Sequence, residues 1–524
     1  MKSNDQELEM YLLQLVAALR YEKKRDRHSS KGSSRHTHLS EAAQLDFADL
    51  SPLARFLVDR ACTCDAPHGL AFMLYWYLRV ESTSDPMQEN KEMFGEVLSV
   101  YMVKMPEQIR FLLDQQKKLI TDVGEAQKKT MNEGGSRDKK QKRMAEILSN
   151  IDFSELEAPS FFDPTERLVG VGDKVKMFQS ALCPVALTVH KKLTEEEETK
   201  LEDDFNASRR EKMMEVRKKH EKEGGSLMSE KVMIKMDLIE KASVERERLT
   251  KEYMESEKQM KVMFKVGDDV RQDQLVLQLI KVMDECLKKV GMDLKLTSYG
   301  VLATSTDTGI LEFVSNSNSV ELLDKGAAGI GDYLRENQPD PIPSPTNKLG
   351  IKKEALDTFS RSLAGYAVIT YLLGVGDRHL GNVMMLPDGR FLHIDFGFIL
   401  GDDPKKKFFT PPPFRITRSM IDAMGGQDSE YFTEFCKHAI GAFLELRKHA
   451  YLIMSLLRLM KDAGIDALQT EDKEEKLNFV LKRFHLELDE EEAQSEFMEK
   501  IKESLSHIGV QILEGFHLLA RLAR

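Results

Sequence analysis

The stretch Gly374-Val-Gly-Asp-Arg-His-Leu-Gly-Asn382, followed by His393-Ile-Asp-Phe-Gly397, decides the fold of this chain. A short turn at Pro387-Asp-Gly389 separates the two stretches. Phosphoryl transfer needs residues of these kinds, because negative charge spreads over the transferred phosphoryl oxygens in the transition state. The protein must supply oxygen ligands for a metal ion and a group directed at the attacking hydroxyl.

Each polar residue of these stretches has an ordinary structural interpretation as a turn or strand-end residue. Their order and spacing together make that interpretation improbable. We expect Asn382 and Asp395 to bind the metal ion, and we assign catalytic roles to Asp377, Arg378 and His379. The order Asp-Arg-His, in place of the His-Arg-Asp of protein kinases, indicates a phosphoinositide kinase.

An apolar run upstream ends in Lys265, whose ammonium group can meet ATP phosphate oxygens. The next helix opens with Val270-Arg-Gln-Asp-Gln-Leu275, in which Asp273 can orient Lys265 or face the nucleotide. An earlier turn of small residues, Phe178 to Pro184, contains Ser180 as a hydrogen-bond donor for phosphate. That turn is a weak signal alone, because it lacks the repeated glycines of a Walker loop.

The alternation of apolar residues predicts an α+β fold, with strands first and helices later. A chain of 524 residues that is 41% hydrophobic can bury at least two cores. Long helical patterns run from Asn90 to about Asn150, with a break at Asn132 to Ser136. We predict neighbouring strands at 186–189 and 262–265, further strands at 294–304 and 310–314, and a helix at 272–290.

Composition and charge restrict the class of protein. A net charge of -11 argues against nonspecific nucleic-acid binding. No segment reaches the apolar length that spans a bilayer, so membrane contact is expected to be peripheral. Five irregularly spaced cysteines favour a reducing compartment, and we expect a cytoplasmic protein.

Beyond the two catalytic stretches, four further motifs resemble class III phosphatidylinositol 3-kinase: Met10-Tyr-Leu-Leu-Gln-Leu15, Ser180-Ala-Leu-Cys-Pro184, Gly267-Asp-Asp-Val-Arg-Gln-Asp-Gln274 and Val301-Leu-Ala-Thr-Ser305. The resemblance covers nearly the whole chain. It implies a partial all-α helical domain at 1–86, a helical linker at 87–165 and a bilobal catalytic domain at 166–524. The family's N-terminal C2 domain is expected to be missing, and a charged insertion is expected at 193–260.

The resemblance also implies site roles, cofactors and partners. It implies ATP with Mg2+ or Mn2+, and production of phosphatidylinositol 3-phosphate on endosomal or autophagic membranes. It further implies a regulatory protein-kinase-like subunit and a coiled-coil beclin-like subunit. The residues implied to bind ATP are Ser180 in the phosphate loop, Lys265, Asp273 and Tyr299 in the inner pocket, and Phe313 with Val314 at the adenine hinge.

Two departures from the family pattern keep alternatives open. Gly381 stands where class III enzymes usually carry an acidic residue, and the resulting Gly381-Asn382 sequence also resembles phosphatidylinositol 4-kinases. The segment after Gly397 carries the additional basic residues Lys405, Lys406 and Lys407, which we assign to the lipid headgroup. An atypical protein kinase and a catalytically inactive scaffold are the remaining alternatives.

Overall fold

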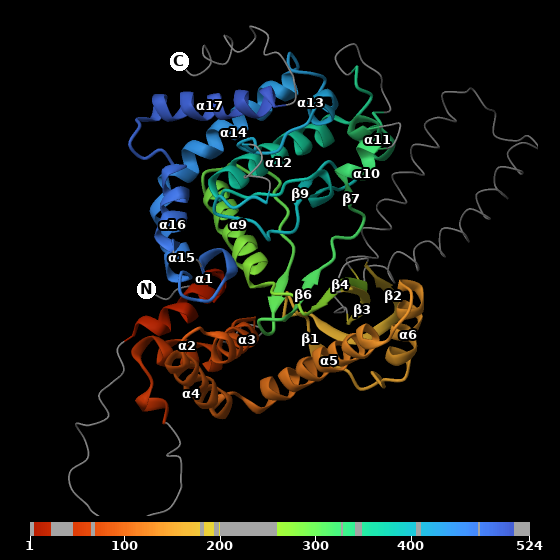
Figure 1. Ribbon diagram of the computed structural model, residues 1–524, viewed down its shortest axis with the longest axis vertical. Helices are drawn as coiled ribbons and strands as arrows, with labels where there is room; N and C mark the ends of the chain where they lie inside the picture. Colours follow the sequence, from red (N-terminus) through yellow and green to blue (C-terminus); the bar gives the residue numbers. More distant parts are fainter. Residues whose placement is uncertain are drawn as a thin grey trace, which may run out of the picture. The chain divides into compact units, whose positions relative to one another are not determined.

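The computed structural model describes residues 5–22, 46–63, 69–178, 183–192, 199, 259–325, 329–340, 348–404, 410–469 and 472–507. The chain forms two compact units (Figure 1). The larger unit combines Met1–Pro106 with Gly267–Arg524, and the smaller unit is Glu107–Val266. This division into compact units is no test of the domain boundaries predicted at 1–86, 87–165 and 166–524. Those boundaries stay a prediction. The insertion at 193–260 lies outside the described residues, apart from Thr199 and the first two residues of strand β4.

The smaller unit contains two helices and an antiparallel sheet. The helices are α5 (Glu107–Asn132) and α6 (Arg137–Ser149). Antiparallel pairing joins, in chain order, β1 (Ala158–Pro159), β2 (Arg167–Met177), β3 (Val185–Lys192) and β4 (Gln259–Val266). Val185 lies opposite Phe264 and Leu187 opposite Val262, which confirms the predicted pairing of these two runs.

The apolar periodicity of α5 explains how this helix packs. Its buried side chains recur every three or four residues, including Ile109, Leu112, Leu113, Leu119, Ile120 and Val123. The helix contacts β1 and β4, where Phe161 meets Phe264 edge to face with ring centroids 5.9 Å apart. The predicted break after Asn132 is confirmed, and Ser136 accepts a hydrogen bond from the Lys139 amide to cap α6.

The larger unit begins with a group of packed helices. These are α1 (Asp5–Ala18), the 3-10 turns η1 (Leu19–Tyr21) and η3 (Phe47–Asp49), α2 (Pro52–Thr63), α3 (Gly69–Ser84) and α4 (Gln88–Lys104). Helix α3 packs against α1 and α4, and the Tyr101 hydroxyl donates to the Ala71 carbonyl at 2.8 Å. The sequence analysis missed the end of α4: Lys104 is its last residue, and Pro106 follows two residues later.

The remainder of the larger unit mixes short strands with longer helices. Helix α9 (Arg271–Lys289) confirms the predicted helix, and β5 (Val301–Ala303) pairs with β6 (Thr308–Glu312) as a hairpin shorter than predicted. A three-stranded sheet has the order β7 (Asn318–Ser319), β8 (Val383–Met385) and β9 (Phe391–His393). The other elements are α10 (Val320–Lys325), α11 (Gly329–Asn337), α12 (Lys353–Leu372), η4 (Leu380–Asn382), α13 (Arg418–Ala423), α14 (Glu430–Lys448), α15 (Ala450–Leu459), η5 (Asp466–Leu468), α16 (Lys473–Lys482) and α17 (Glu490–Ser506).

Helix α12 forms the centre of the larger unit and leads directly into the first catalytic stretch. It contacts α14 and β9. Near its C-terminal end, Tyr371 packs edge to face against Phe443 and Phe497, whose own rings stack with centroids 4.5 Å apart. Such aromatic pairs stabilise a core beyond the area they bury. They hold the end of α12 in place three residues before Gly374.

Three buried charges connect the N-terminal helices. Arg20 donates to Glu81 at 2.6 Å and to Asp85 at 3.1 Å, and all three side chains are less than 10% exposed. Asp85 also accepts from the Met87 amide and from Asn90, whereas Glu81 faces the interior. Burial raises the pKa of Glu81 to about 7, against the lowering effect of Arg20.

We expect Arg20→Met to destabilise the chain by about 3–5 kcal/mol at pH 8, because it leaves a buried carboxylate without its cation. The loss should be smaller at pH 6. The Glu81 carboxyl holds its proton more tightly in the folded chain, so stability falls as the pH rises from the unfolded value toward the folded pKa. Removing Arg20 raises that folded pKa further.

Thermal and denaturant unfolding at both pH values measure this effect. The matched control is Lys437→Met, which removes an exposed ion pair with Glu434 on α14 and should cost at most about 1 kcal/mol. Equal losses in the two variants, or a loss independent of pH, would contradict the interpretation.

Candidate active site

The first catalytic stretch follows α12 as a loop held by backbone hydrogen bonds. The Gly376 amide donates to the Phe398 carbonyl at 2.9 Å, and the Gly401 amide donates to the Gly374 carbonyl at 3.0 Å. A side chain at Gly376 would place its Cβ 2.0 Å from the Asp402 carbonyl oxygen. Gly374 has a φ of +59°, a conformation that favours glycine. Glycine is therefore required where this loop touches the segment that follows Gly397.

Asp377 and His379 lie together at the exposed side of this loop. Asp377 has a φ of +49°, and its amide donates to the Asp403 carboxylate at 2.8 Å. The Gly381 amide donates to Nδ1 of His379 at 3.1 Å. Since Nδ1 accepts a hydrogen bond, the neutral imidazole carries its proton on Nε2, which lies 4.0 Å from Oδ2 of Asp377.

Arg378 points inward and directs its guanidinium at backbone carbonyls. It donates to Gly376 at 2.8 Å, to Ile394 at 2.8 Å, and to Asp395. Burial lowers the pKa of Arg378, while the neighbouring Asp395 and Asp377 carboxylates oppose that shift. The structure thus places Arg378 where it joins the two catalytic stretches.

The Asp395-Phe396-Gly397 turn is held from beneath by the first turn of α9. Asp395 has a φ of +60°, and its Oδ1 accepts from the Gly397 amide at 3.3 Å. The Phe396 amide donates to Oδ1 of Asp273 at 3.0 Å, and the Phe396 carbonyl accepts from Nε2 of Gln272 at 2.7 Å. The sequence analysis missed this role of Gln272, although the residue lies in the quoted Val270–Leu275 stretch.

Asn382 lies next to the Asp395 turn because the β8–β9 hairpin pairs Val383 with His393. The Ile394 amide donates to the Asn382 carbonyl at 3.0 Å, and Nδ2 of Asn382 donates to the Asp377 carbonyl at 3.3 Å. The Asn382 amide nitrogen is thus used within the loop, and the side-chain oxygen is the atom it can offer to a metal. One carboxylate and one amide oxygen fit Mg2+ or Mn2+, which complete their coordination with phosphate and water.

His393 is a buried residue to which we assign no catalytic role. Its ring stacks on Tyr366 with centroids 5.2 Å apart, and burial lowers its pKa well below the usual range. The imidazole is therefore neutral and belongs to the core beneath the site.

The structure places four of the predicted ATP-binding residues in the larger unit. Asp273 and Tyr299 are buried, and burial, followed by the nearby Asp273 carboxylate, raises the pKa of the Tyr299 hydroxyl. Phe313 and Val314 connect β6 to β7, and the Ser317 hydroxyl donates to the Val314 carbonyl at 2.8 Å.

Of the other predicted binding residues, only Lys265 is among the described residues. Lys265 lies on β4 in the smaller unit. Ser180 and Lys405, Lys406 and Lys407 lie outside the described residues. Within the described ranges, no group of three or more His, Cys, Asp or Glu side chains is arranged to hold a metal ion.

Two family models match the chain. Residues 259–470 match the phosphatidylinositol 3- and 4-kinase family, and residues 1–113 match the accessory (PIK) domain of the phosphoinositide 3-kinase family. The first of these ranges contains Asp377, His379, Asn382 and Asp395. The second contains helices α1 to α4.

Curated relatives match along the whole chain. Phosphatidylinositol 3-kinase pik3 of Schizosaccharomyces pombe is 32% identical over 533 residues, which are 100% of this chain and 55% of that protein. Phosphatidylinositol 3-kinase VPS34 of Arabidopsis thaliana is 32% identical, covering 100% of this chain and 54% of that protein. The Saccharomyces cerevisiae protein of the same name is 30% identical, with 100% and 55% covered.

The chain thus spans about half the length of the curated relatives it matches. No helix in the described ranges has the length and apolar character to cross a membrane. The catalytic geometry, the two family models and these relatives agree. The chain therefore belongs to the phosphatidylinositol 3-kinase family, with the family's accessory helical domain and its catalytic domain.

Proposed function

We propose that this chain transfers the γ-phosphoryl group of ATP to the 3-hydroxyl of phosphatidylinositol, on the cytoplasmic face of endosomal or autophagic membranes. The observation that carries the proposal is the arrangement of Asp377 and His379 beside the Asp395 turn, joined by Arg378. The similarity to three phosphatidylinositol 3-kinases supports the choice of lipid and ring position.

The tautomer of His379 indicates which catalytic role belongs to His379 and which to Asp377. Nδ1 of His379 is occupied by the Gly381 amide and Nε2 carries a proton, so the neutral ring is a donor toward the reaction. Asp377 therefore accepts the proton of the attacking hydroxyl, whose oxygen forms the new bond to phosphorus as the bond to the leaving phosphate oxygen breaks. His379 donates Nε2–H to a transferred phosphoryl oxygen, where negative charge gathers.

Asn382 and Asp395 would hold Mg2+ or Mn2+, which would offset the charge of the ATP phosphates. The ATP site would also include Ser180, Lys265, Asp273, Tyr299, Phe313 and Val314. We propose that Lys405, Lys406 and Lys407 bind the lipid phosphate. A regulatory protein-kinase-like subunit and a coiled-coil beclin-like subunit are the proposed protein partners.

A 4-kinase is the second candidate, and Gly381 favours it because class III loops usually carry an acidic residue there. Radiolabelled ATP with phosphatidylinositol vesicles separates the two candidates. We expect the labelled phosphate at the 3-position, as measured by product regiochemistry. Label at the 4-position would replace the first candidate with the second, and label on protein alone would exclude both.

We expect Asp395→Asn to lower kcat about 100-fold or more, because a metal-binding charge is worth several kcal/mol in the transition state. Folding should be retained, since an asparagine oxygen can still accept from the Gly397 amide. The matched control is Asp388→Asn in the β8–β9 turn, where the carboxylate is 45% exposed and pairs with Arg390. Turnover in Asp395→Asn equal to that of this control would refute the metal assignment.

Replacing Lys405, Lys406 and Lys407 together with glutamine should lower lipid phosphorylation about 100-fold, because three ammonium groups near an anionic surface contribute about 1 kcal/mol each. ATP hydrolysis in the absence of lipid should change little. Both rates are measured on the same preparation. A parallel fall in the two rates would assign the lysines to the ATP site or to folding.

A further inference from the structure

The first turn of α9 uses three consecutive side chains to hold two separate pieces of backbone. Arg271, Gln272 and Asp273 are each less than 10% exposed. Arg271 donates to the carbonyls of Ala463 at 3.0 Å and Gly464 at 2.8 Å. Asp273 accepts from the Phe396 amide, as described above.

Gln272 bridges the Asp395 turn and η5. Its Nε2 donates to the Phe396 carbonyl at 2.7 Å, and its Oε1 accepts from the Ala467 amide at 3.0 Å. Both polar ends of this buried amide are therefore paired. With Asp273 on the Phe396 amide, both polar backbone groups of Phe396 are held by adjacent residues of one helix.

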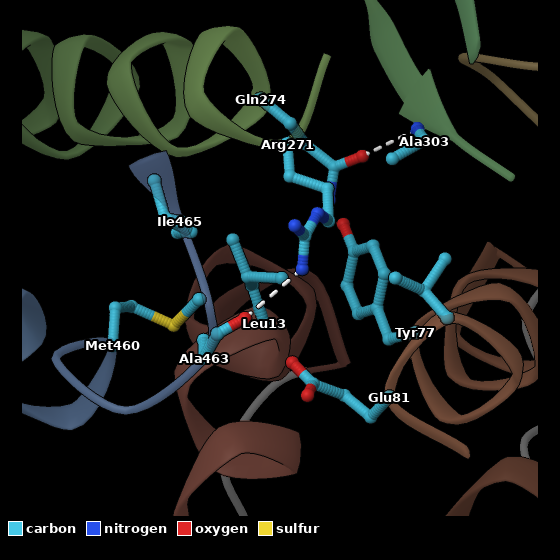
Figure 2. A pocket seen from close by; sticks show the side chains of 10 residues that line it. Leu13, Tyr77, Glu81, Arg271, Gln274, Ala303, Met460, Ala463 and Ile465 are labelled. Atoms are coloured by element: carbon cyan, nitrogen blue, oxygen red, sulfur yellow. Dashed lines mark hydrogen bonds between the residues drawn. The ribbon is translucent and has the colours of Figure 1, made fainter. Parts of the chain in front are cut away.

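The segment that contains Ala467, the second partner of Gln272, is itself held in place. Asp269 pairs with Arg271 at 2.6 Å and directs its guanidinium toward Ala463 and Gly464. Figure 2 shows Arg271 reaching the Ala463 carbonyl in a cavity also lined by Tyr77 and Glu81 of α3. The segment that carries Ala467 is thus fixed at its start by Arg271. Gln272 therefore connects two backbone segments that other contacts also hold in position.

The position of Asp395 depends on this bridge. Asp395 adopts a φ of +60°, which costs a non-glycine residue free energy and persists only where neighbouring contacts impose it. Its neighbour Phe396 is buried, and an unpaired Phe396 carbonyl would lose a hydrogen bond in a place that water does not reach. Loss of the Gln272 donor therefore lets the turn rotate and moves the carboxylate away from Asn382.

We propose that Gln272 is a positioning residue for phosphoryl transfer, which sets the place of the Asp395 carboxylate through Phe396. It contacts the turn and η5, and it acts only through them. The proposal rests on the proposed function for its effect on rate, whereas its structural part concerns the described residues alone.

The test compares Gln272→Met with Gln274→Met. Both glutamines lie on the first turn of α9, each is 7% exposed, and Oε1 of Gln274 accepts from the Ala303 amide at 2.7 Å (Figure 2). The two variants lose similar volume and polarity, but only the first loses contact with Phe396. We expect Gln272→Met to lower kcat about tenfold or more and to raise the Mg2+ concentration for half-maximal rate, with the KM for lipid unchanged.

Gln274→Met should keep kcat within about twofold of the unaltered chain. Amide hydrogen exchange supplies a readout independent of activity. Peptides covering 394–400 and 463–469 should exchange faster in Gln272→Met and at the unaltered rate in Gln274→Met. Equal kcat and equal exchange in the two variants would overturn the proposal.

Gln272→Glu in its ionised form keeps the acceptor for Ala467 and removes the donor to Phe396, so this variant, measured at alkaline pH, serves where Gln272→Met fails to fold. Faster exchange confined to 394–400 is expected in that variant, and unchanged exchange there would count against the bridge. If the unaltered chain phosphorylates no lipid, the proposed function fails. The exchange comparison then still decides whether Gln272 holds the turn.

Discussion

Two backbone hydrogen bonds, from the Gly376 amide to the Phe398 carbonyl and from the Gly401 amide to the Gly374 carbonyl, join the first catalytic stretch to the segment that follows Asp395. At the other end, the β8–β9 hairpin joins the same two segments by pairing Val383 with His393. The catalytic residues lie between these two attachments. These main-chain contacts fix the two ends of the site, and the side chains of Arg378, Gln272 and Asp273 hold the backbone between them.

This arrangement requires backbone conformations that most residues avoid. Asp377 and Asp395 both have positive φ values, as does Leu400. Arg378 fills the space between the two segments and donates hydrogen bonds to three of their carbonyls. A buried guanidinium is costly to desolvate, and the nearby Asp377 and Asp395 carboxylates offset part of that cost. The strain and the buried charge are thus concentrated where the reaction takes place.

The sequence predicted best those features that depend on nearby residues. Asn382 and Asp395 are brought together by one hairpin, so their spacing alone indicated a shared site. The helix at 272–290 and the pairing of 186–189 with 262–265 followed from apolar periodicity. The strand at 294–304 was predicted too long, because Lys295 takes a positive φ and only Val301–Ala303 pairs with β6.

Contacts between distant residues escaped the sequence analysis. Gln272 meets Phe396 and Ala467, residues 124 and 195 positions away, and no local pattern reports such a meeting. The sequence analysis assigns Arg378 a catalytic role together with Asp377 and His379. Its three carbonyl partners became visible only once the loop was folded around it.

Gly381 is the clearest departure of the catalytic loop from its family pattern, and the fold gives it a physical reason. A Cβ at this position would lie 3.0 Å from Oε2 of Glu321 and 3.0 Å from the His379 ring. An acidic side chain there would bring a second negative charge against Glu321, and like charges at this distance repel. Glycine removes that repulsion, and Glu321 of α10 places a carboxylate beside the catalytic loop instead. The loop therefore carries no acidic side chain of its own at this position, and the carboxylate that lies against it belongs to Glu321.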